Sequence, residues 1–83
     1  MSVSTIAEID RQKFQSLIGE RQWTAKEFHK RWQEAYRFTV KYNNFMELIN
    51  NNVSWKLVYA LTIAEMLESN VNELFSLSRI EHE

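Results

Sequence analysis

The sequence predicts an all-α fold, a compact bundle of about five short helices in a single domain. The 83 residues include no proline and one glycine, whereas a sheet protein needs turn residues about every ten residues, between successive strands. Hydrophobic residues make up 45% of the chain, enough to build one core at this length. We expect the domain to span 1–83, with its core over about 6–77 and a flexible tail at 78–83.

The first helix is predicted from Thr5 to about Gln22. Thr5 and Glu8 have the spacing of a capping box, in which a hydroxyl and a carboxylate bind the free amides at a helix start. Apolar residues then recur at helical spacing, namely Ile6, Ile9, Phe14, Leu17 and Ile18.

A second capping box, Thr24 with Glu27, begins the second predicted helix, and Trp23 stands before it as a hydrophobic staple residue. One face of this helix is apolar and the other is basic. The apolar side chains are interpreted as core packing. The apolar face consists of Phe28, Trp32, Ala35 and Tyr36, and the basic face consists of Lys26, Lys30, Arg31 and Arg37.

A turn is expected at 38–40, and a third helix from near Lys41 to about Asn50. Its apolar residues, Phe45, Leu48 and Ile49, are predicted to be buried. Asn50–Asn52 should end it, because asparagine tolerates the left-handed backbone conformation. The remaining side chains are expected to face outward, namely Tyr42, Asn43, Asn44, Met46, Glu47 and Asn50.

Ser54 is predicted to cap a fourth helix that ends at Ser69 and Asn70, and Asn72 to cap a short fifth helix. The polar tail, apart from Ile80, is expected to fray. The fourth helix should bury Leu57, Val58, Leu61, Ala64 and Leu67, and the fifth Leu74, Phe75 and Leu77.

The composition argues against several classes of protein. The absence of cysteine excludes disulfides and thiolate metal sites and favours the cytosol. The longest apolar run, 57–64, is too short to span a membrane, and 1–10 lacks the features of a signal peptide. His29 and His82 lack metal-ligand spacing, and no glycine-rich loop or tuned carboxylate pair is recognisable. We therefore expect no enzyme activity, metal or cofactor.

Charge is distributed unevenly along the chain, although the net charge is only −1. Residues 11–41 contain eight basic and three acidic residues, a net charge of +5, and residues 42–83 contain two basic and six acidic residues, a net charge of −4. Scattered solvated charge explains such a split about as well as a surface that faces a polyanion does.

The order of these segments resembles the lambda-repressor-like (Cro/repressor type) helix-turn-helix family over about residues 9–77. The resemblance lies in Thr24-Ala25-Lys26-Glu27-Phe28, in Val40-Lys41-Tyr42-Asn43-Asn44-Phe45, and in Val53-Ser54-Trp55-Lys56-Leu57 leading to Val71-Asn72-Glu73-Leu74-Phe75. The interval from Thr24 to Val40 is about six residues longer than in the family, so we expect a lengthened second helix or turn. The turn glycine is absent, and Ala25 replaces the family's glutamine.

The resemblance implies a small sequence-specific transcriptional regulator, of the phage, mobile-element or bacterial type, whose third helix reads the major groove of double-stranded DNA. Asparagine can bind adenine through two hydrogen bonds, and glutamate can accept one from cytosine. A homodimer is expected, with Leu77 and Ile80 at its interface. The implied base contacts are Tyr42, Asn43, Asn44 and Glu47, and the phosphate contacts Thr24, Lys26, Lys30, Arg37 and Lys41.

An alternative function is binding to a protein, as an antirepressor, antitoxin or phage-encoded inhibitor that keeps the repressor-like scaffold. The absent glycine, the absent glutamine and the acidic pI of about 6.1 favour this alternative.

Overall fold

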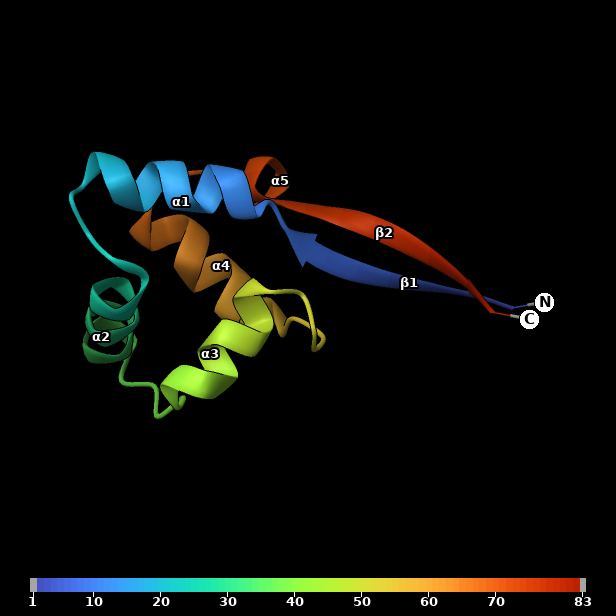
Figure 1. The fold of residues 1–83 in the computed structure, drawn as a ribbon, viewed down its shortest axis with the longest axis horizontal. Helices are drawn as coiled ribbons and strands as arrows, with labels where there is room; N and C mark the ends of the chain where they lie inside the picture. Colours follow the sequence, from blue (N-terminus) through green and yellow to red (C-terminus); the bar gives the residue numbers. More distant parts are fainter. Residues whose placement is uncertain (1, 83) are drawn as a thin grey trace.

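The computed structural model describes the backbone of residues 2–82 and the side chains of residues 5–77. Five helices lie between two strands, one at each end of the described chain (Figure 1). In chain order the elements are β1 (Ser2–Ile9), α1 (Arg11–Glu20), α2 (Ala25–Tyr36), α3 (Tyr42–Ile49), α4 (Leu57–Met66), α5 (Val71–Leu74) and β2 (Phe75–His82). The fold is therefore mostly helical, but the all-α prediction is wrong at both ends.

β1 and β2 form a two-stranded antiparallel sheet that projects from the helical body (Figure 1). Ile9 lies opposite Phe75, and Ser2 lies opposite His82. The expected capping box at Thr5 and Glu8 does not form, because these residues are extended. Instead Asp10 caps α1, its carboxylate accepting a hydrogen bond from the backbone N–H of Lys13 at 3.1 Å.

The C-terminal predictions also change. Asn70, not Asn72, is the N-cap residue of α5, and this helix is a single turn. Phe75 and Leu77 lie in β2 instead of a helix, and the residues expected to fray, up to His82, continue that strand. Pairing with a strand about seventy residues away decides this conformation, and local sequence patterns do not report such a partner.

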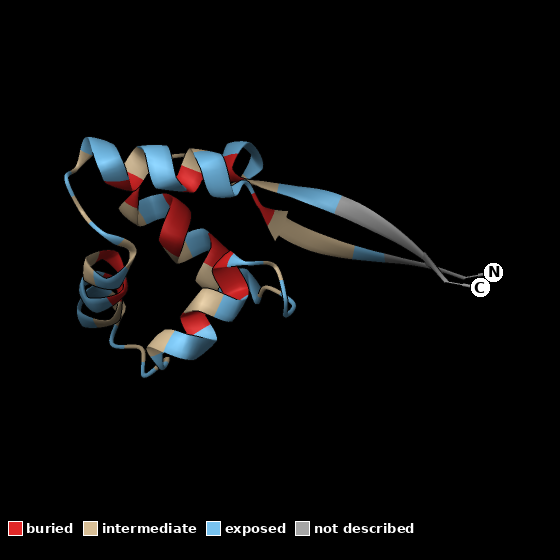
Figure 2. Ribbon diagram, in the orientation of Figure 1, coloured by how far each residue is buried: buried red, intermediate tan, exposed pale blue. Residues whose placement is uncertain are grey.

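Aromatic side chains fill the core between the helices. Phe14 of α1 meets Phe28 of α2 edge-on, with ring centroids 5.2 Å apart, and Phe45 of α3 stacks on Phe28 at 6.0 Å. Trp32 is fully buried, and its indole N–H donates to the Thr62 hydroxyl of α4 at 2.9 Å. Figure 2 shows that the buried positions of α1 to α4 face one another. The predicted apolar faces of α1, α2 and α3 are confirmed except at Ala35 of α2, which is exposed.

α4 is rotated relative to the prediction. It begins at Leu57 after Lys56, without a side-chain cap, so Ser54 is not its N-cap residue. Leu57, Val58 and Leu61, which we expected to be buried, are exposed. The helix is apolar on almost every side, so periodicity could not identify the inward face. The helix buries Ala60, Ile63 and Ala64, and Leu67 is buried at its C-terminal end.

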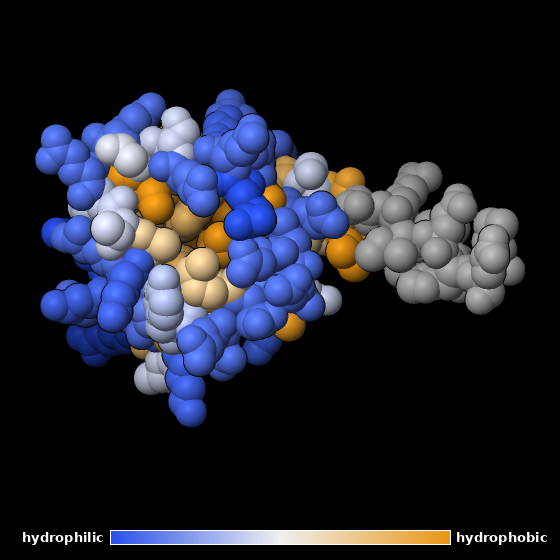
Figure 3. Space-filling view, in the orientation of Figure 1, coloured by the Kyte–Doolittle hydropathy of each residue, from blue (hydrophilic) through white to orange (hydrophobic). Residues whose placement is uncertain are grey.

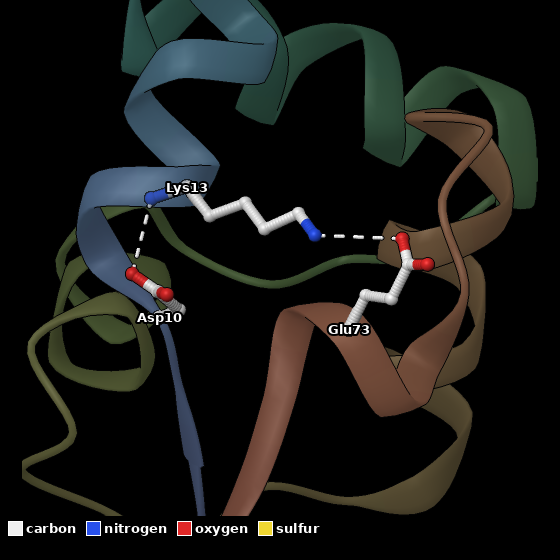
Figure 4. Close-up of polar contacts among 3 residues, drawn as sticks. All are labelled: Asp10, Lys13 and Glu73. Atoms are coloured by element: carbon white, nitrogen blue, oxygen red, sulfur yellow. Dashed lines mark hydrogen bonds and ion pairs between the residues drawn. The ribbon is translucent and has the colours of Figure 1, made fainter.

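Polar contacts tie α1 to the C-terminal half of the chain. The ammonium group of Lys13 reaches from α1 to the carboxylate of Glu73 on α5, 3.4 Å away (Figure 4). The guanidinium group of Arg21 donates to the backbone oxygen of Leu67 at 3.0 Å. These contacts link α1 to α5 and to the C-terminal end of α4. Among the described residues, no helix is long and apolar enough to span a membrane.

Candidate nucleic-acid interface

The segment between α2 and α3 is held by two local features. Arg37 ends α2 in the left-handed conformation, with φ 57°, at the kind of position where a glycine is usual. The His29 ring makes a 2.6 Å hydrogen bond through Nε2 to the backbone oxygen of Val40. The same ring packs on Tyr42 and Phe45, with centroids 5.4 and 5.1 Å away. His29 is therefore a buried residue that fixes where α3 begins.

α3 presents a polar outer face, as predicted. Asn43, Asn44 and Glu47 are exposed, and Phe45 is fully buried below them. Met46, also predicted to face outward, is partly buried against the core. Tyr42 departs from the prediction as well, because its ring is half-buried against His29. It is thus partly committed to packing, and the most accessible predicted base-contacting residues are the other three.

A shallow hollow lies along α2 and reaches the start of α3 at Tyr42. Its lining brings together Thr24, Lys26 and Lys30 of the α2 face with Tyr42 of α3. Thr24 caps α2, its hydroxyl accepting from the backbone N–H of Glu27 at 3.1 Å. The predicted capping interaction is thus confirmed. The rest of the lining is Glu27, His29, Gln33 and Glu34.

A second hollow lies along one flank of α3, against the α3–α4 linker. Asn44 and Glu47 line it together with Val53 and Lys56. Lys56 is a basic residue that the sequence interpretation did not assign to the site. Its ammonium group lies 5.6 Å from the centre of the Tyr59 ring. The only sequence signal for it was its position at the start of α4.

Four of the predicted phosphate-contacting side chains are exposed cations: Lys26, Lys30, Arg37 and Lys41. Within the described part of the chain, none of them forms an ion pair. Arg31, on the same helix as two of them, is different. It pairs with Glu27 at 3.3 Å and lies over the Trp23 ring at 5.0 Å. We therefore do not count it with the four exposed cations.

The helical body also carries an exposed apolar patch, three of whose four residues, Leu57, Val58 and Leu61, were predicted to lie in the core. It consists of Val53, Leu57, Val58 and Leu61, and Leu57 is 72% exposed. Val53 joins this apolar patch to the hollow beside α3. In Figure 3, which shows one face of the molecule, most of the surface around the helices is hydrophilic, with apolar side chains visible between α1, α2 and α3.

The two predicted dimerisation residues lie on β2. The side chain of Leu77 is 77% exposed. The side chain of Ile80 lies outside the described residues. The predicted role of this pair stays a prediction.

Comparisons with protein-family models, with curated proteins and with solved structures found no match for this chain. Among the described residues, no group of three or more His, Cys, Asp or Glu side chains could hold a metal ion.

Proposed function

We propose that the protein binds double-stranded DNA by placing α3 in the major groove, and that it acts as a sequence-specific transcriptional regulator. One observation carries the proposal: an exposed polar helix face lies between two hollows that each have lysine in their lining. Lys26 and Lys30 line one hollow beside Glu27 and Glu34, and Lys56 lines the other beside Glu47. The major groove of DNA is complementary to this arrangement, because its base edges lie between two rows of negatively charged phosphates.

The dimensions of α3 suit this role. An α-helix with its side chains is about 10 to 12 Å in diameter, which fits the major groove, about 12 Å wide, and the eight residues of α3 make about two turns. The carboxamides of Asn43 and Asn44 can each donate to adenine N7 and accept from its amino group. Glu47 can accept from the amino group of cytosine. The exposed face therefore offers direct base recognition from three adjacent side chains.

The start of α3 adds a phosphate contact. Lys41 precedes the helix, and no side chain caps the first amides. Those amides carry a partial positive charge, which favours an anion at this position. The unpaired ammonium groups of Lys26 and Lys30 lie on the neighbouring helix. Together they would anchor the DNA backbone beside the reading helix.

Selection of binding sequences from a random duplex library tests the reading role. The wild-type protein should enrich one short motif, and a protein with Asn43→Ala and Asn44→Ala should lose that preference while keeping weak general binding. Asn72→Ala, which changes an exposed asparagine on α5, is the matched control and should keep the motif. An unchanged motif in the double variant would contradict the assignment of α3.

The exposed apolar patch on α4 supports a second candidate function, binding to a protein. Its four residues are 46% to 72% exposed, and exposed apolar patches often mark interaction sites. A photo-cross-linking residue at Leu57, compared with one at the exposed Gln12, would test it. A discrete cross-linked polypeptide at position 57 alone supports this function, and equal labelling at both positions counts against it.

A further inference from the structure

The hydrogen bonds at the base of β1 show which way each of its backbone groups points. The N–H and C=O of Ile9 both bind the side chain of Asn51, at 2.9 and 3.2 Å, so they point away from β2. The next residue, Asp10, donates its N–H to the backbone oxygen of Leu74 at 2.8 Å, toward the β2 side. Because these directions alternate along a strand, Ala7, Thr5 and Val3 share the orientation of Ile9.

Three consecutive pairing positions on the outer edge of β1 are therefore open. The sheet has two strands, so within the described chain no third strand binds the backbone groups of Val3, Thr5 and Ala7. Figure 1 shows the sheet projecting away from the helices. Asn51 occupies the fourth position, at Ile9, in the manner of a neighbouring strand. The open edge thus begins just beyond Ile9.

The sequence of β1 does not protect this edge. Edge strands commonly carry lysine, proline or inward-pointing charge to prevent pairing. The strand Ser2–Ile9 contains no lysine, arginine or proline, its one charged residue is Glu8, and half of its residues are β-branched. β2 differs, because it contains Arg79, Glu81 and His82. A two-stranded sheet is only marginally stable in water, so a further strand would stabilise it.

We infer that β1 pairs with β1 of a second copy, antiparallel about a two-fold axis beside Thr5. In that register Thr5 faces its own counterpart, and Val3 of each copy faces Ala7 of the other. All three open positions then form hydrogen-bonded pairs, and the two sheets join into one of four strands. An interface in which one strand pairs with itself is the isologous contact of a two-fold dimer. The inference is independent of DNA binding.

Proline substitution on each edge of the sheet tests this interface. Ala7 and Leu77 lie opposite each other and both direct their N–H groups outward, on opposite edges. Ala7→Pro removes only an N–H of the β1 edge, and Leu77→Pro is the matched control on the β2 edge. In sedimentation over about 1 µM to 1 mM, the wild type should dimerise, Ala7→Pro should raise the dimer Kd at least about tenfold, and Leu77→Pro should not.

A wild type that is monomeric throughout, or a loss of association that is equal in both variants or confined to Leu77→Pro, would overturn the inference. Cross-linking decides the matter if Ala7→Pro does not fold. The Cα atoms of a hydrogen-bonded antiparallel pair lie about 5.5 Å apart, within reach of a disulfide. The chain has no cysteine, so Thr5→Cys should oxidise to a covalent dimer much faster than Leu77→Cys. Equal rates in the two variants would refute the register.

Discussion

The side chain of Asn51 replaces a missing strand beside Ile9. Its oxygen accepts the Ile9 N–H at 2.9 Å, and its nitrogen donates to the Ile9 backbone oxygen at 3.2 Å. The indole N–H of Trp55 also donates to the Asn51 side-chain oxygen, at 3.4 Å. Asn51 itself has φ 60°, a left-handed conformation that asparagine tolerates better than most residues. One residue therefore ends α3 and holds the base of the sheet.

Asn51→Ala should lower the free energy of unfolding by about 2 to 3 kcal/mol. It removes three partly buried hydrogen bonds, two to the Ile9 backbone and one from Trp55, and places alanine in a left-handed conformation. Denaturant unfolding provides the measurement, with Asn52→Ala, at the exposed neighbouring position, as the control. A loss below about 0.5 kcal/mol would show that the carboxamide contributes little.

Thr62→Val should destabilise the fold by about 1 to 3 kcal/mol, because the buried indole N–H of Trp32 would lose its acceptor. The substitution preserves the side-chain shape, so a cavity does not contribute. The exposed Thr39→Val serves for comparison and should change stability by less than about 0.5 kcal/mol. Equal effects at both positions would argue against the hydrogen bond.

The Tyr36 phenol should make stability depend on alkaline pH. Burial, the hydrogen bond to Glu65 and the negative charge of that carboxylate together raise the pKa of Tyr36 above 10.0. As the pH rises, the unfolded chain therefore loses this proton before the folded chain does. The contribution of the phenol to the free energy of unfolding is complete below pH 10.0, and it declines as the pH rises through the pKa that Tyr36 has in the folded chain.

Tyr36→Phe should remove that part of the pH dependence and cost no more than about 0.5 kcal/mol near neutral pH, because the hydrogen bond to Glu65 is exposed to solvent. Unfolding free energies of the two proteins between about pH 9 and pH 11 provide the comparison. The difference between them should shrink as the pH rises. A constant difference would show that the phenol does not contribute to the alkaline loss of stability.

The sequence predicted those elements whose signals are local. Thr24 caps α2 as expected, and α3 begins and ends where its apolar spacing and Asn51 indicated. The strands were missed because their partner is distant in sequence: Thr5 and Glu8 fit a helix start equally well until β2 pairs with β1. Local signals carry no information about such pairing.

The candidate site was predictable to a similar extent. The exposed carboxamides of Asn43 and Asn44 follow from the spacing of α3. The half-burial of Tyr42 depends on the His29 ring, and the exposure of Leu57 depends on the rotation of α4. Both are properties of how helices pack together, which the periodicity of one helix cannot reveal.

The most direct test of the central claim is the salt dependence of binding to duplex DNA, measured by fluorescence anisotropy. If Lys26, Lys30, Arg37 and Lys41 contact phosphates, a plot of the logarithm of the binding constant against the logarithm of the salt concentration should have a slope of about −4. The Lys26→Ala, Lys30→Ala variant should lower the steepness by about 2, and Arg11→Ala, at an exposed cation on α1, should leave it unchanged. No binding at low salt, or an equal change in both variants, would contradict DNA recognition by this surface.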